Sequence, residues 1–140
     1  MKIADIFSLI VPDERGVAFR AYDGSSAGPA DATVTLELRS QRGISYLVHE
    51  PNQLGLARAY VSGDLEIIGD THEAMMRLYP APPVNLSVAD KARIIAKFVP
   101  AALKRPAPPP QERVLEGERH SKRRDAEAIS HHYDVSNRFY

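Results

Sequence analysis

The sequence predicts an α+β protein in which a small sheet packs with several helices. Two patterns indicate this class. Apolar residues recur every three or four positions in five separate segments, as on one face of a helix, whereas residues 17–22 and 33–39 alternate between apolar and polar, as half-buried strands do. With 140 residues, the chain is long enough for one compact domain with an appendage and too short for two full domains.

Residues 2–10 form the first predicted helix, which ends before Pro12. Its apolar residues lie at helical spacing: Ile3, Ile6, Phe7 and Ile10. The two alternating segments follow, and residues 23–29 between them are rich in Asp, Gly and Ser, which favour turns. The simplest arrangement of the two strands is therefore an antiparallel hairpin with a long loop.

Residues 41–50 predict a second helix, which Pro51 ends. Asn52 can cap the third helix, and Gly63 stands where the left-handed residue after its last turn belongs. We expect this third helix to bury an apolar stripe of four residues, Leu54, Ala57, Tyr60 and Val61. Residues 64–68 then alternate as a third, short strand, which completes the small sheet.

Asp70 and Glu73 have capping-box spacing and open a fourth helix, which the prolines from Pro80 onward end. Ser87 opens a fifth helix, which we expect to break near Pro100. Apolar residues on these two helices have two interpretations, a buried core or a groove for an acyl chain, and the core is the more common role. They are Met75, Met76 and Tyr79 on the fourth helix and Ile94, Ile95 and Phe98 on the fifth.

The composition changes at about residue 104. We assign residues 1–103 to an N-terminal domain, which we expect to bind lipid or to mediate oligomerisation. Residues 104–118 are predicted to be a linker, because the prolines favour extended polyproline conformation and the charged residues that follow leave little to bury. Residues 119–140 then begin a further segment.

The overall charge narrows the classes of partner. Lys plus Arg and Asp plus Glu both number 18, so no net positive field attracts nucleic acid. The chain has no cysteine, which excludes disulfides and thiolate metal sites. No apolar run approaches the roughly 18 residues that span a bilayer, and the N-terminus lacks the features of a signal peptide.

A basic cluster opens the last segment and has two interpretations. It consists of Arg119, His120, Lys122, Arg123 and Arg124. Such a cluster can bind lipid phosphate groups, each basic residue near an anionic membrane contributing about 1 kcal/mol. It can equally be the solvated start of a helix, balanced by neighbouring acidic residues, and the spacing alone favours this second interpretation.

The end of the chain concentrates polar and aromatic side chains. His131 and His132 are adjacent, and adjacent residues of a helix point about 100° apart, so the pair is poorly placed to bind one metal ion. Tyr133, Phe139 and Tyr140 can be core residues of a further domain or the wall of a ligand pocket. The spacing does not separate these two roles.

Two segments resemble one enzyme family. Gly55-Leu-Ala-Arg-Ala-Tyr-Val-Ser-Gly-Asp-Leu-Glu-Ile-Ile-Gly-Asp70 resembles the N-terminal domain of cyclopropane-fatty-acyl-phospholipid synthases. His131-His-Tyr-Asp-Val-Ser-Asn-Arg-Phe-Tyr140 resembles the opening of their catalytic domain, which the mycolic acid cyclopropane synthases and fatty-acid methyltransferases share. The order and spacing of the two segments agree with the family, and the resemblance covers most of residues 40–140.

The resemblance implies a methyltransferase that uses S-adenosylmethionine to modify the cis double bond of a phospholipid acyl chain, giving a cyclopropane or a methyl branch. A bound bicarbonate removes the proton in the cyclopropanation. It also implies that residues 119–140 hold the first helix of a Rossmann-like catalytic domain. The reaction passes through a carbocation, which aromatic faces stabilise by about 0.5–2 kcal/mol each.

Carried over by position, Tyr133 is the residue that we expect to line the cofactor and acyl pocket. The same motif contains His132, Asp134, Ser136, Asn137, Phe139 and Tyr140. Lipid-headgroup candidates are Arg119, Lys122, Arg123 and Arg124. The family's glycine-rich cofactor loop and its bicarbonate ligands have no counterpart in these 140 residues, so we expect the chain alone to be inactive and to bind no metal or cofactor.

The sequence therefore predicts the N-terminal part of a lipid-modifying methyltransferase. We expect it to act in the cytoplasm at the inner face of the membrane, on phospholipid with unsaturated acyl chains and in contact with an anionic surface or a second copy in a homodimer. The competing hypothesis is a free-standing, non-catalytic module that binds lipid or protein. Nucleic acid is not an expected partner.

Overall fold

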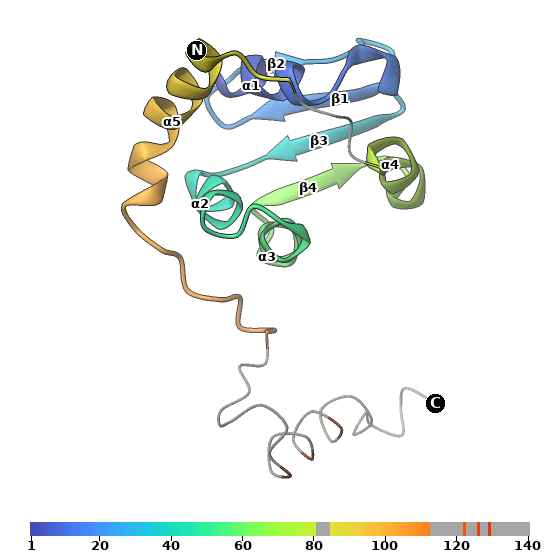
Figure 1. Cartoon of the computed structure of the whole chain (residues 1–140). Coiled ribbons are helices and arrows are strands. Elements are labelled where there is room, and N and C mark those ends of the chain that lie inside the picture. Colours follow the sequence, from blue (N-terminus) through green and yellow to red (C-terminus); the bar gives the residue numbers. More distant parts are fainter. Residues whose placement is uncertain (81–84, 113–121, 123–125, 127–128, 130–140) are drawn as a thin grey trace. The chain divides into compact units, whose positions relative to one another are not determined.

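The computed structural model describes residues 1–80, 85–112, 122, 126 and 129 (Figure 1). It divides into two compact units, Met1–Pro109 and Pro110–Tyr140, and the helices and strands below all lie in the first unit. The helices are α1 (Ile3–Ile10), α2 (Gln41–His49), α3 (Gln53–Val61), α4 (Thr71–Leu78) and α5 (Val88–Ala102), with a short 3₁₀ turn at Asp13–Arg15. The strands are β1 (Val17–Ala21), β2 (Ser26–Ala27), β3 (Val34–Leu38) and β4 (Leu65–Ile68).

The strands form one mixed sheet in the order β2-β1-β3-β4. β1 and β3 are parallel, with Val17 opposite Val34 and Ala21 opposite Leu38. β2 runs antiparallel to β1, and β4 runs antiparallel to β3. Helices and a small sheet therefore share one unit, which confirms the predicted α+β class.

The predicted antiparallel hairpin between the two alternating segments is wrong. The turn-rich stretch contains a strand of its own, since β2 folds back on β1 through a tight turn in which the Ala21 amide donates to the Ser25 carbonyl at 2.9 Å. Residues 28–33 then return the chain to the starting end of β1, so β3 enters parallel to it. Two residues suffice for β2, which is too short to produce a visible alternation.

The core lies on the sheet face that holds the buried residues of β1 and β3. Alternate residues of a strand point to the same face, and those at Val17, Phe19, Val34, Leu36 and Leu38 are all buried. Phe7 of α1 stacks on Phe19 with ring centroids 4.5 Å apart. Further buried members of this cluster come from the helices and β4: Ile3, Ala4, Ile44, Tyr46, Ala59, Leu65, Ala74 and Ala101.

The predicted helix starts are confirmed. The Asn52 side chain accepts hydrogen bonds from the amides of Leu54 and Gly55 at 2.8 and 3.4 Å and so caps α3. Asp70 and Ser87 cap α4 and α5 in the same way. The end of α3 is also as predicted, because Gly63 has a left-handed φ of 75°.

The predicted buried stripe of α3 is wrong. Leu54, Tyr60 and Val61 are each more than two-fifths exposed. The buried face instead carries the small residues Gly55 and Ala59. Close contact with α2 selects this face, because only small side chains let the two helices approach each other, and hydropathy alone does not encode that requirement.

The two interpretations of the apolar residues on α4 and α5 also need correction. Met75, Met76 and Tyr79 of the fourth helix region and Ile95 of the fifth are exposed, so they are not core. Figure 1 shows α4 and α5 at opposite ends of the sheet, so their apolar residues do not form one groove either. Ile94 and Phe98 are partly buried, as a core role requires.

The expected break of the fifth helix at Pro100 is displaced. The helix continues to Ala102, and the Leu103 amide still donates to the Val99 carbonyl at 3.1 Å. The segment after α5 then packs on α2, where the Tyr46 hydroxyl donates to the Ala107 carbonyl at 2.7 Å. Part of the segment predicted to be a linker thus lies in the first unit, while the domain assignment of residues 104–140 stays a prediction.

Candidate functional site

The predicted pocket residues stay predictions. Tyr133 and its motif neighbours from His132 to Tyr140 lie outside the described residues, as do Arg119, Arg123 and Arg124. Lys122 is described, and it is an exposed residue in helical conformation. The geometry below therefore concerns the first unit, which holds the other family-like segment, Gly55–Asp70.

Asp64 is the centre of the best-developed polar cluster in the described part of the chain. It follows Gly63 at the end of α3 and is 6% exposed. Its carboxylate accepts hydrogen bonds from Ser40 Oγ at 2.6 Å, Arg42 Nε at 2.6 Å and Ser62 Oγ at 2.7 Å. We call Asp64, Ser40, Arg42 and Ser62 the Asp64 cluster.

The Asp64 cluster joins three elements. Ser40 caps α2, and Ser62 ends α3. The backbone of Asp64 adds two bonds, because its carbonyl accepts from the Arg39 amide at 2.8 Å and its amide donates to the Ala59 carbonyl at 2.9 Å. The cluster therefore fixes the start of α2 and the end of α3 against the beginning of β4.

The electrostatics of Asp64 suit this structural role. Burial by itself raises the pKa of the carboxyl, but the hydrogen bonds from Arg42, Ser40 and Ser62 and the charge of Arg42 outweigh it, so the pKa lies below its usual value. A carboxylate with a low pKa and three donors is a weak base. Its chemistry favours holding the fold together over proton transfer.

Close packing of α3 on the end of α2 explains why residue 55 of the same segment is a glycine. A Cβ atom there would lie 2.0 Å from the Glu50 carbonyl oxygen and 2.7 Å from that of Tyr46. No side chain fits such a distance from a backbone atom, so glycine is needed for α3 to approach the end of α2. The glycine and aspartate of this family-like segment are thus accounted for by packing.

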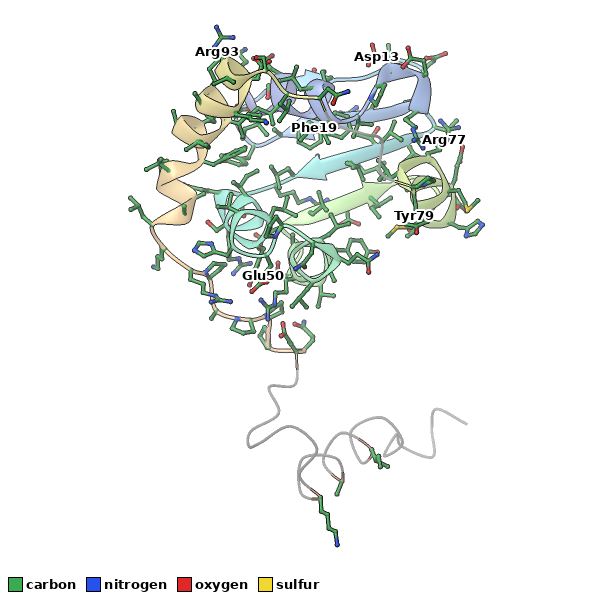
Figure 2. All side chains as sticks on the ribbon, viewed as in Figure 1. Asp13, Phe19, Glu50, Arg77, Tyr79 and Arg93 are labelled. Carbon is green, nitrogen blue, oxygen red and sulfur yellow. The ribbon has the colours of Figure 1, made fainter. Side chains whose placement is uncertain are left out.

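A second polar cluster surrounds Arg77 at the starting end of β1 and β3 (Figure 2). Arg77 Nη1 donates to the Gly16 carbonyl at 2.6 Å, and its Nη2 pairs with the Glu73 carboxylate. Glu73 also accepts from Thr33 Oγ1 at 3.0 Å. The cluster ties α4 to the strands, and its guanidinium charge is balanced by Glu73.

An open pocket of about 240 Å³ adjoins this cluster. Its lining comprises Gly16, Pro29, Asp31, Ala32, Thr33 and Arg77. Arg77 is already paired with Glu73, and Asp31 adds a negative charge, so the pocket offers little attraction for a phosphate group. Its size is below the roughly 300 Å³ at which ligand clefts begin.

A third cluster holds the first turn of α1. Asp23 Oδ2 accepts from the Ile3 amide and Ser25 Oγ accepts from the Ala4 amide, each at 3.1 Å. Burial acts to raise the pKa of Asp23, but the hydrogen bonds that it accepts from the Ser25 hydroxyl and from the Ile3 and Ser25 amides, together with the positive charge of Lys97, 3.9 Å away, lower the pKa overall. The segment between β1 and β2 thereby binds the first amides of α1, and Lys97 of α5 pairs with its aspartate.

Within residues 1–80 and 85–112, and at 122, 126 and 129, no three His, Cys, Asp or Glu side chains cluster closely enough to hold a metal ion. No helix in this part of the chain is long and apolar enough to cross a membrane. Every buried side-chain polar atom there has a hydrogen-bond partner.

The fold and its clusters define a small α+β unit whose main polar groups hold its own elements together. Comparison with known proteins confirms the resemblance found in its motifs, because the chain is similar to proteins named probable fatty acid methyltransferases. No protein-family model matches the chain.

Two relatives carry this assignment. The chain is 44% identical over 99% of its length to a protein of Mycobacterium tuberculosis named probable fatty acid methyltransferase Rv3720, of which it covers 35%. It is 34% identical over 86% of its length to a probable fatty acid methyltransferase of Pseudomonas putida, of which it covers 25%. The chain thus spans between a quarter and about a third of the length of these curated relatives.

Proposed function

We propose that this chain is the N-terminal part of an S-adenosylmethionine-dependent methyltransferase that modifies the cis double bond of phospholipid acyl chains, by cyclopropanation or methyl branching. The observation that carries the proposal is the 44% identity over 99% of the chain to a probable fatty acid methyltransferase. The motif at residues 131–140 resembles the opening of the catalytic domain in the same class of enzyme.

In this proposal the first unit, Met1–Pro109, is an accessory domain. This assignment is supported by the polar clusters of the unit, which hold its helices and strands together. Asp64 holds α2, α3 and β4 together, Arg77 holds α4 to the strands, and Asp23 holds α1. Each cluster has an assigned structural task, and the acyl-modifying chemistry belongs to the catalytic remainder of the enzyme.

The motif at the end of the chain supplies one wall of the proposed catalytic pocket. S-adenosylmethionine, when bound, provides the electrophilic methyl group, and bicarbonate accepts the proton in cyclopropanation. Tyr133, Phe139 and Tyr140 suit a cationic reaction in residue type, because aromatic faces attract positive charge. Residues beyond those of the first unit would hold the cofactor.

We propose association with the inner face of an anionic membrane as the setting of the reaction. The substrate is then a phospholipid with an unsaturated acyl chain, reached from the bilayer surface. Arg119, Lys122, Arg123 and Arg124 are candidates for headgroup contact, since phosphate groups attract clustered basic side chains.

The test uses the longer enzyme that contains these 140 residues. Purified enzyme is incubated with methyl-labelled S-adenosylmethionine and vesicles of phosphatidylglycerol with cis-monounsaturated chains, and the fatty acids are analysed by mass spectrometry. We expect the label in acyl chains, in a cyclopropane or a methyl branch, and a loss of about 10²-fold or more for Tyr133→Ala.

Two controls make this test decisive. Vesicles with fully saturated chains should take up no label, because they lack the double bond. A Tyr60→Ala variant changes an exposed tyrosine of the first unit and should retain activity within about twofold. Absence of label from unsaturated lipid would overturn the proposal and favour a non-catalytic module.

A further inference from the structure

Helix α5 presents an uninterrupted apolar stripe to solvent. We define the α5 stripe as Val88, Ala92, Ile95, Val99, Ala102 and Leu103. These positions recur every three or four residues and so lie along one side of the helix. The large ones are well exposed: Val88 by 84%, Ile95 by 66%, Val99 by 47% and Leu103 by 81%.

The other side of α5 explains why this stripe faces outward. Ile94, Phe98 and Ala101 are the more buried residues of the helix, and Ala101 belongs to the hydrophobic core. Figure 2 shows side chains of α5 on the side of the helix that is turned away from the sheet. The helix is therefore apolar on two sides, and the domain covers one of them.

Basic side chains outnumber acidic ones along α5 and the residues that follow it. Residues 88–105 contain five basic side chains and one acidic one. Three of the basic residues form ion pairs, Arg93 with Asp90, Lys97 with Asp23 and Arg105 with Glu50. Lys91, in the first turn of α5, and Lys104, two residues after its end, have no ion-pair partner among the described residues.

We propose that the α5 stripe is a docking surface for an anionic lipid bilayer, on which α5 lies parallel to the membrane plane. The inference rests on the proposed function and names the element that carries its membrane association. A basic helix with an apolar side that faces solvent suits this location, because the exposed apolar residues enter the boundary between headgroups and acyl chains while the basic residues contact phosphate groups.

Charge favours an anionic bilayer over two other possible partners of the α5 stripe, a second copy of the chain and residues 112–127. A second copy of the chain would place the same excess of basic residues opposite itself, so like charges would oppose the contact. Residues 112–127 of this chain contain five acidic and five basic side chains, and so offer no negative complement. An anionic bilayer satisfies both the apolar stripe and the basic residues.

The test is vesicle flotation of the 140-residue chain with a matched pair of variants. Ile95→Glu places a charge in the α5 stripe, and Met76→Glu places the same charge on α4 at a residue with the same exposure of 66%. Both positions are exposed, so both variants should fold, which circular dichroism verifies. Vesicles contain phosphatidylglycerol with phosphatidylcholine, or phosphatidylcholine alone.

We expect the wild-type chain and Met76→Glu to bind the anionic vesicles equally, within about twofold, and Ile95→Glu to bind about tenfold more weakly or worse. A Lys91→Gln, Lys104→Gln double variant should lose several-fold in binding to anionic vesicles, with little change on phosphatidylcholine. High salt should weaken wild-type binding in the same way.

Several results would overturn the docking surface. In the first, the wild-type chain does not bind anionic vesicles. In the second, Ile95→Glu binds these vesicles as well as the wild type does. In the third, light scattering shows that Ile95→Glu converts a dimer into a monomer while vesicle binding is unchanged. The methylation experiment separates these failures from failure of the proposed function. Label transfer with unaltered Ile95→Glu binding would reject only the docking surface, whereas stripe-dependent binding without label transfer would reject only the enzyme.

Discussion

At the scale of single residues, Asp64 shows how one side chain can stabilise several elements. Its three side-chain donors come from residues 2, 22 and 24 positions away. The helix caps Asn52 and Asp70 were predictable because a cap and its amides lie within three residues. The Asp64 cluster was not, since its partners meet only when the chain folds.

Replacing Asp64 with Asn should therefore destabilise the protein. The variant keeps the volume but removes the charge that Arg42 and two hydroxyl groups contact, and we expect the free energy of unfolding to fall by about 2 kcal/mol. Urea denaturation measures the change. Asp13→Asn, at an exposed carboxylate, is the control and should change the free energy by less than about 0.5 kcal/mol.

The pH dependence of stability provides an independent check of Asp64. Its pKa in the folded protein is below the usual 3.8. The unfolded chain therefore takes up a proton first as the pH falls, so the contribution of Asp64 is complete above about pH 4 and is lost as the pH drops through the folded-state pKa. Asp23, whose pKa is also lowered, acts in the same direction.

We expect unfolding monitored from pH 6 to pH 2 to show a steep loss of stability below about pH 4 in the wild type and a shallower loss in Asp64→Asn. Parallel curves for the two proteins would contradict the assignment of Asp64 as a charged structural residue.

At the scale of elements, small residues decide how α3 packs. The helix approaches α2 closely at Gly55 and buries Ala59 on the same face, while larger apolar residues such as Leu54 and Val61 remain exposed. Hydropathy predicted the opposite face. The physical reason is that the backbones of α2 and α3 come too close for a side chain at residue 55.

Gly55→Ala should accordingly destabilise the protein by about 1–3 kcal/mol, even though alanine favours a helix. The new Cβ would overlap the Glu50 carbonyl oxygen, so α3 must move away from α2. Thermal denaturation gives the size of the effect.

Gly63→Ala is the matched comparison for Gly55→Ala. Its Cβ would meet no atom within 4 Å, so it should cost only the backbone strain of a positive φ, about 1 kcal/mol. A Gly55→Ala variant as stable as the wild type would refute the close approach of the two helices.

In the sheet, the sequence pattern located the strands but not their relative direction. Alternation correctly located β1 and β3, and their buried residues face the core as expected. Their relative direction was wrong, because β2 and the return segment convert an apparent hairpin into a parallel pair. Strand direction depends on the path of the connection, and two residues of strand leave no recognisable pattern in a turn-rich segment.

At the scale of the whole molecule, the described core belongs to the first unit. All thirteen residues of the core cluster lie between Ile3 and Ala101. A chain of residues 1–109 should therefore unfold at the temperature of the 140-residue chain, within about 2 °C, because it keeps all thirteen of these residues. Differential scanning calorimetry measures both proteins.

Residues 1–87, which lack α5, are the comparison for this truncation. Removing α5 takes Ala101 from the core and Phe98 from its edge, and it exposes the part of α2 that α5 contacts. We expect the midpoint to fall by about 10 °C or more. Equal midpoints for residues 1–87 and 1–109 would mean that α5 contributes nothing to the fold.

The sequence by itself determined the α+β class, the five helices with most of their ends, and the relationship to fatty acid methyltransferases. These features depend on neighbours within about four residues or on motifs read along the chain. Tertiary structure decided the parallel pairing of β1 and β3, the buried face of α3, the Asp64 cluster and the exposure of the α5 stripe. Each of these requires distant segments to meet, and the space between those segments selects which side chains can be buried.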